Sequence, residues 1–171
     1  MSLTESNTGR NLLRLLRSAN EQSVVLGLEI HKSNPTPEST QMLAAYHKLY
    51  EELFKVNIEV LSPEHIVKFN GSHLLIRGKL RQLPKEIGQL RQLQALYMEF
   101  IQLTELLPEI GHIDQLLELH LSHNQLRELP TEIKQLKRLQ VLHIAENQLT
   151  ELPPEIGQLT NLESLNLWDN K

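Results

Sequence analysis

Three histidines and a glutamate in the second half of the chain are the residues best suited to chemistry. His120 and His143 lie 23 residues apart, and Glu118 and His123 flank the first of them. Imidazole and carboxylate groups are ligands that Zn²⁺ accepts, and a histidine also serves as a general base. A metal site or a hydrolase site on these residues is therefore the enzymatic hypothesis that the sequence leaves open.

The spacing of the two histidines argues against this hypothesis. If His120 and His143 lie side by side on neighbouring strands, their Cβ atoms stand roughly 5 Å apart and the side chains run parallel. Parallel side chains do not converge on one ion, and no residues that would support such a site can be assigned. We therefore expect no metal ligand, no catalytic residue and no cofactor. Polar or pH-sensitive surface contacts are the expected role of these histidines.

Composition and charge restrict the classes of partner. Of the 171 residues, 40% are apolar but only 4% are aromatic, so leucine and isoleucine must form most of the core. Residues 80–171 contain 8 Lys and Arg against 13 Asp and Glu, which gives this part a charge of −5. Nucleic-acid binding requires clustered Lys and Arg, so an acidic surface argues against it. Because cysteine is absent, disulfides and thiolate chemistry are excluded.

Neither a secretory signal nor a membrane span is predicted. The first residues, Met1 to Asn7, lack the basic and then apolar pattern of a signal segment. No stretch approaches the ~18 apolar residues of a membrane-spanning helix. Together with the absence of cysteine, these features predict a cytoplasmic protein that does not bind membranes.

An internal repeat of 23 residues begins at Leu80. Four copies follow one another without a gap, at residues 80–102, 103–125, 126–148 and 149–171. Apolar residues recur in the same columns, for example Leu80, Leu103, Leu126 and Leu149, then Ile87, Ile110, Ile133 and Ile156, then Leu96, Leu119, Leu142 and Leu165. This steady register indicates a stack of equivalent units that bury one continuous core.

Each repeat is predicted to contain one strand and one short helix. The segment Leu142-His143-Ile144 alternates apolar and polar residues, as a half-buried strand does. The segment from Leu129 to Ile133 places Pro130 and a glutamate where a helix would start. The recurring Glu86, Glu109, Glu132 and Glu155 are thus interpreted as helix-start residues, because a catalytic carboxylate pair must converge in a cleft. Since the proline of the second repeat is shifted by one position, its helix is expected to start differently.

These columns resemble the leucine-rich-repeat family in its 23-residue form, LxxLPxEIGxLxxLxxLxLxxNx, over residues 80–171. The resemblance implies an α/β fold, a right-handed solenoid with a parallel sheet on its concave face and short helical or irregular segments on its convex face. It also implies that Asn124, Asn147 and Asn170 form a ladder that bonds backbone groups at the turn of each coil. The first repeat departs from this pattern, since Ile101 stands in the asparagine column.

Residues 1–79 are predicted to form a helical cap over the N-terminal end of the solenoid, because a stack of coils exposes apolar core at its ends. Leucines at 12–16 and aliphatic residues at 24–30 mark two helices, and Thr36 with Pro37 starts a third. The third helix has an apolar stripe made of Met42, Leu43, Tyr46, Leu49, Tyr50, Leu53 and Phe54. The alternative is a separate ligand-binding or enzymatic unit in residues 1–60, although that segment has no Gly-rich phosphate loop and no GxSxG or HExxH motif.

The end of this first region is predicted to lead into the sheet. The segment from Ser62 to Glu64 predicts one more short turn, and Asn70-Gly71 is a strong turn signal. Residues 73–76 should then form a strand of a degenerate repeat. Counting back from Leu80 places Leu75 in the second apolar column and Gly78 in the asparagine column.

Outward-facing strand positions are the expected site of partner binding, because they are free to vary on a scaffold whose inward columns are fixed. The candidate concave-face residues are Tyr97, Glu99, Glu118, His120, His123, His143, Glu146, Asn166 and Trp168. Exposed aromatic residues are typical of interface anchors. The alternative is that Tyr97 and Phe100 pack under the N-terminal cap and that Trp168 is covered by a further repeat or a second chain.

The function expected from the sequence is a protein-interaction module, not an enzyme. It would bind a protein of unknown identity on its concave face, as the recognition part of a larger protein. The main alternative is a self-assembling unit. No polar capping segment follows the apolar columns of the last repeat, so two chains could pair there as a homodimer. The histidine-based metal or hydrolase site is the third hypothesis.

Overall fold

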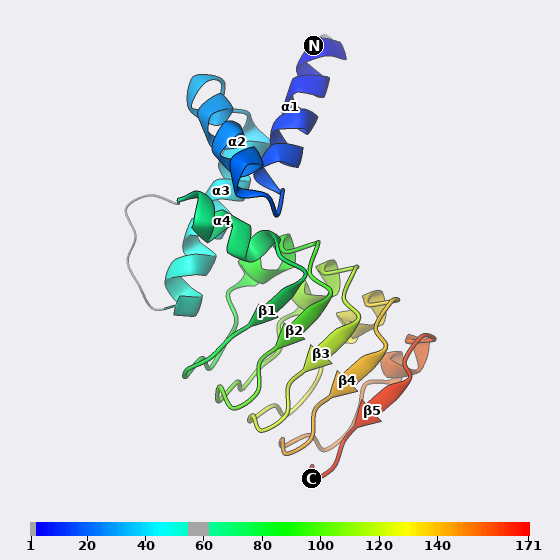
Figure 1. The fold of residues 1–171 in the computed structure, drawn as a ribbon. Helices are drawn as coiled ribbons and strands as arrows, with labels where there is room; N and C mark the ends of the chain where they lie inside the picture. Colours follow the sequence, from blue (N-terminus) through cyan, green and yellow to red (C-terminus); the bar gives the residue numbers. More distant parts are fainter. Residues whose placement is uncertain (1–2, 55–61) are drawn as a thin grey trace. The chain divides into compact units, whose positions relative to one another are not determined.

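The computed structural model describes residues 3–54 and 62–171, with side chains from Arg10 onward, and is shown in Figure 1. The chain divides into two compact units, residues 1–71 and 72–171. The first unit is helical and the second contains the repeats. Within the described ranges, no helix combines the length and the apolar character needed to cross a membrane.

The helical unit consists of α1 (Leu3–Leu16), α2 (Glu21–Ser33), α3 (Pro37–Phe54) and α4 (Pro63–Asn70). The side chain of Asn20 accepts a hydrogen bond from the backbone N–H of Ser23 and thereby caps α2. Helix α3 begins at Pro37, the predicted start. Helix α4 is an eight-residue helix rather than the predicted short turn. The backbone N–H of Ser62 donates to His65 Nδ1 and stabilises its first turn.

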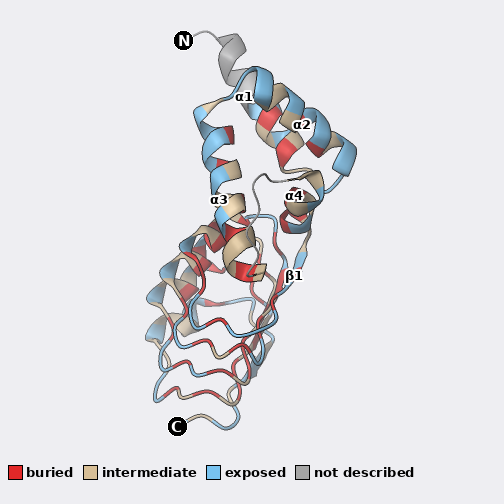
Figure 2. Ribbon diagram, turned by 90° about the vertical axis from the view of Figure 1, so that its left-hand side faces the viewer, coloured by how far each residue is buried: buried red, intermediate tan, exposed pale blue. Residues whose placement is uncertain are grey.

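A buried polar group ties three of these helices together. Tyr46 of α3 is 2% exposed, and its hydroxyl donates to Asn70 Oδ1 at 3.0 Å. The amide of Asn70 in turn donates to the carbonyl oxygens of Leu16 and Ser18, at the end of α1. Burial raises the pKa of Tyr46 to about 12, and the charge of Arg17 opposes this shift only in part. Buried residues such as these line the inner faces of the helices in Figure 2.

The repeat unit is built on a parallel sheet of five short strands, in the order β1 (His73–Leu75), β2 (Ala95–Tyr97), β3 (Glu118–His120), β4 (Val141–His143) and β5 (Ser164–Asn166). From β2 to β5 the paired residues lie 23 positions apart, so Leu96, Leu119, Leu142 and Leu165 stand beside one another. The first three of these leucines are fully buried. The predicted α/β solenoid with a parallel sheet is therefore confirmed.

The register of strand β1 differs from the predicted register by one residue. His73 pairs with Ala95, and Leu75 pairs with Tyr97, so the spacing here is 22 residues rather than 23. Leu74 and Ile76 are therefore buried, whereas Leu75 is 49% exposed and not in an apolar column. A slip of one residue moves every side chain of a strand to the opposite face. Gly78 likewise stands before the asparagine column, where its φ of 98° requires a residue that tolerates the left-handed region.

Four 3₁₀-helices form the other side of the coils: η1 (Lys85–Gln89), η2 (Pro108–His112), η3 (Thr131–Gln135) and η4 (Pro154–Gln158). Each contains an isoleucine of the eighth column, and Ile87, Ile110 and Ile133 are fully buried. All four helices begin at the same repeat position, whether or not that position is a proline. The expectation that the second helix starts differently was therefore wrong.

The asparagine column connects the backbones of successive coils. Asn147 Oδ1 accepts from the N–H of Leu126, and its amide donates to the carbonyls of Leu121, Ile144 and Ala145. Asn124 and Asn170 make the corresponding bonds in their own coils, for example to the N–H groups of residues 103 and 149. Asn124 and Asn147 are each 8% exposed. A buried amide that satisfies several backbone groups in this way stabilises the turn of each coil.

Candidate interaction surface

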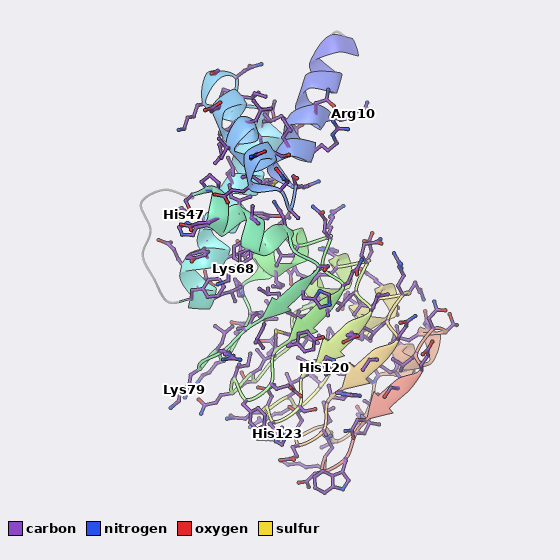
Figure 3. The ribbon with its side chains drawn as sticks, in the orientation of Figure 1. Arg10, His47, Lys68, Lys79, His120 and His123 are labelled. Atoms are coloured by element: carbon purple, nitrogen blue, oxygen red, sulfur yellow. The ribbon has the colours of Figure 1, made fainter. Side chains whose placement is uncertain are left out.

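The strands present their outward positions in adjacent columns on the open face of the sheet. One column contains Tyr97, His120 and His143, which are half-buried, and Asn166, which is exposed. Glu118, His123 and Glu146 are half-buried beside it, whereas Glu99 and Trp168 are exposed. Figure 3 shows His120 on the sheet and His123 in the turn that follows the same strand. The structure thus brings most of the predicted residues together and places Trp168 apart, on the last coil.

A hydrogen-bonded cluster joins Tyr97, Glu118 and His120 across β2 and β3. The Tyr97 hydroxyl donates to Glu118 Oε2 at 2.9 Å, and His120 Nε2 lies 3.3 Å from the same oxygen. The rings of Tyr97 and His120 stack with centroids 4.7 Å apart. Each side chain is therefore held by two neighbours, which fixes the shape of this part of the surface.

The same contacts shift the two acidic groups in opposite directions. The hydrogen bond from Tyr97, with a smaller contribution from His120, lowers the pKa of the Glu118 carboxyl. The bond to Glu118 raises the pKa of the Tyr97 hydroxyl. Because the pKa of Glu118 is depressed in the folded chain, the bond stabilises the fold above the ordinary pKa of a glutamate. That contribution is lost as the pH falls through the folded-state pKa.

Replacement of Tyr97 by phenylalanine tests this cluster. Without the donating hydroxyl, the pKa of Glu118 should rise toward its ordinary value of 4.5, as followed by an NMR titration of the side-chain carboxyl carbon. The control is Ser164→Ala, which removes a hydroxyl that lies 3.2 Å from His143 Nε2, away from Glu118. An unchanged pKa of Glu118 in Tyr97→Phe would show that the bond is not formed in solution.

His120 and His143 lie side by side, and each imidazole has a partner of its own. Their ring centroids are 4.9 Å apart with an edge-to-face angle of 86°. One imidazole is bonded to Glu118 and the other to Ser164. Across the described part of the chain, no three His, Asp or Glu side chains are grouped so that they could hold a metal ion.

A second row of side chains stands at the turns after the strands. Phe100, His123, Glu146 and Asp169 share one repeat position and have φ between 52° and 61°. Phe100 and His123 stack with centroids 4.0 Å apart, and His123 Nδ1 lies 2.7 Å from Glu146 Oε2. Left-handed backbone is unfavourable for a residue with a Cβ, above all a bulky one such as phenylalanine. The fold of each coil therefore holds these four residues in an unfavourable backbone conformation. Their side chains form a row along the solenoid.

For Phe100 the sequence left two roles open, an exposed residue beside Glu99 or a residue packed under the cap. Its side chain is 67% exposed. With Leu75, Ile76, Arg77, Gly78 and Glu99 it lines an open hollow of about 310 Å³.

The repeats are similar to a known protein family and to solved structures. A family model described as "Leucine Rich repeats (2 copies)" matches residues 114–154 and 137–171. A solved leucine-rich-repeat protein of Leptospira interrogans is 38% identical, with a TM-score of 0.60, over 68% of this chain and 31% of that one. The BIR3–SERK2 complex from Arabidopsis thaliana is matched at 27% identity and a TM-score of 0.50, over 55% of this chain and 54% of that one.

The matched part covers less than two thirds of either solved chain. No curated protein matches the sequence. The family model, the solved relatives and the 23-residue register of the strands agree on one assignment. Through its repeat unit, residues 72–171, the chain belongs to the leucine-rich-repeat family.

Proposed function

We propose that the chain is a protein-interaction module that binds its partner on the concave face of the sheet. The observation that carries this proposal is a row of four outward side chains, Tyr97, Glu118, His120 and His143. The strands beneath them, β2 to β4, have fully buried inward leucines. Hydrogen bonds and ring stacking hold these outward side chains in place before any partner arrives. A pre-ordered surface loses less side-chain entropy on binding, so more of its contact energy appears as affinity.

The comparisons support the general class of this function. One of the matched structures is a complex between two proteins, BIR3 and SERK2. We further propose that this chain acts as the recognition part of a larger protein. In the same proposal the helical unit caps the repeats, the protein works in the cytoplasm, and it performs no catalysis of its own.

Affinity capture from the source cell tests the proposal. The bait proteins are the unmodified chain, a concave variant with Tyr97, His120 and His143 replaced by alanine, and a convex variant with Lys85, Gln135 and Gln158 replaced by alanine. The convex residues are exposed on three of the 3₁₀-helices, so both variants remove three surface side chains. A partner that the convex variant retains and the concave variant loses supports the proposal. Retention by the concave variant and loss from the convex one would contradict it.

Self-assembly through the last coil is a second candidate, because apolar surface is exposed there. Leu165 is 41% exposed, and η4 has no buried residue, unlike η1, η2 and η3. Pairing of two such surfaces would form a closed dimer. Sedimentation at increasing protein concentration should then show a rise in mass that Leu165→Glu abolishes. A constant monomer mass would remove this candidate.

A further inference from the structure

The concave columns of the repeats contain carboxylates and no lysine or arginine. The outward strand positions and the turn position of the four repeats include Glu99, Glu118, Glu146 and Asp169. The lysines and arginines of residues 80–171 stand at other repeat positions, for example on η1 and η3. The open face of the sheet therefore has a negative charge that the rest of the repeat unit does not share.

Two of these carboxylates are chain neighbours of exposed aromatic residues. Glu99 precedes Phe100 on the coil of β2, and Asp169 follows Trp168 on the coil of β5. Phe100 is 67% exposed and Trp168 is 69% exposed. Among the described residues, neither Glu99 nor Asp169 has a side-chain hydrogen bond or ion pair. An aromatic face beside an unpaired carboxylate attracts a cation through both the ring and the charge.

The other two carboxylates have partners that are neither lysine nor arginine. Glu118 is bonded to a hydroxyl and an imidazole, and Glu146 to an imidazole, so neither faces a lysine or an arginine. Arg77, which follows β1, lines the hollow next to Glu99 and Phe100. Its charge marks the boundary of the acidic surface on the side of β1.

We propose that the concave face recognises an extended protein segment with arginine or lysine side chains, held by the Glu99–Phe100 pair at one end and the Trp168–Asp169 pair at the other. This inference rests on the proposed function and specifies the chemistry of the partner. Like charges would repel an acidic segment, and nucleic acid is excluded for the same reason.

The geometry of the sheet also sets the spacing of the cations. Strands β2 and β5 are separated by three steps of roughly 4.8 Å, which gives about 14 Å between the two aromatic–carboxylate pairs. An extended peptide advances about 3.4 Å per residue, and every second side chain points to the same side. Basic residues at every fourth position of the segment would therefore meet the two pairs.

The only tryptophan of the chain, Trp168, lies in this surface and reports binding through its fluorescence. The probe is a capped peptide of serines with an arginine at every fourth position, titrated at low salt. Three comparison peptides are used. In the first, glutamate replaces each arginine, and in the second, glutamine does. The third contains the same arginines in one continuous block. We expect a saturable change in Trp168 emission with the spaced arginine peptide, weaker binding of the block and no binding of the others. Added salt should weaken the binding, because these charges are exposed.

Two variants with the same loss of charge separate local recognition from net charge. Glu99→Gln with Asp169→Asn should weaken binding of the spaced peptide about fivefold. Glu128→Gln with Glu151→Gln removes two exposed carboxylates at another repeat position and should change it less than about twofold. Phe100→Leu keeps apolar bulk but removes the ring and should weaken binding about threefold.

Equal weakening by both charge variants, tighter binding of the glutamate peptide or no saturable change would overturn the proposal. Equal binding of the spaced and block peptides would overturn the spacing. The proposed function is tested separately, because the concave alanine variant leaves every carboxylate in place. A captured partner that depends on Tyr97, His120 and His143 but binds Glu99→Gln/Asp169→Asn unchanged would uphold the proposed function and contradict this inference.

Discussion

Asn147→Ala should lower the free energy of unfolding of the repeat unit by about 2–4 kcal/mol. The substitution removes the acceptor of the Leu126 N–H and the donor to three backbone carbonyls. Asn147 is 8% exposed, so water has little access to the groups that lose their partner. A buried backbone N–H without an acceptor is costly because its hydration is lost and nothing replaces it. Urea unfolding followed by circular dichroism measures the change.

The matched control is Asn170→Ala, at the same repeat position of the last coil. Asn170 makes a similar set of backbone bonds, but it is half-buried, so water can replace them. We expect this variant to lose about 1 kcal/mol or less. Equal losses in both variants would mean that burial does not determine the strength of the ladder.

Leu142→Ala should destabilise the repeat unit by about 2–5 kcal/mol, the usual cost of truncating a buried leucine. Leu142 is fully buried between the neighbouring leucines of β3 and β5. Leu165→Ala changes the same residue in the same column, but this side chain is 41% exposed. It should cost less than half as much, because fewer contacts are lost and solvent can enter the space that the truncation leaves. The same urea titration provides the comparison.

The concave variant, with Tyr97, His120 and His143 replaced by alanine, tests the assignment of the outward strand positions. Tyr97, His120 and His143 point outward and are half-buried, so their joint truncation should leave the strands folded. If this variant unfolds while Leu142→Ala stays as stable as the unmodified chain, the assignment of inward and outward positions is wrong.

The four full repeats could be predicted from sequence because one period governs all their columns. A 23-residue spacing places Leu96, Leu119 and Leu142 inward whatever the residues between them. The register of β1 could not be predicted in this way, because the spacing there falls to 22 residues and Leu75 moves to the exposed face. The start of η2 was mispredicted from its proline, whereas the structure shows that all four 3₁₀-helices share one repeat position.

The residues of the candidate surface were predictable as columns, but their contacts were not. The bond from Tyr97 to Glu118 crosses from β2 to β3 and depends on both side-chain rotamers. The left-handed backbone of Phe100 and its stack on His123 left no sequence signal, because such positions usually contain glycine or asparagine. Sequence periodicity thus identified the face, and the packing of individual side chains determined its chemistry.

Site-specific photo-crosslinking tests the central claim, binding on the concave face, most directly. A photoreactive residue would replace His143 or Asn166 on the open face of the sheet, and Gln135 or Gln158 on the 3₁₀-helices. Illumination in the source cell should join a protein partner to the first two positions and not to the last two. Crosslinks confined to Gln135 and Gln158 would place the partner on the convex side and contradict the proposed function.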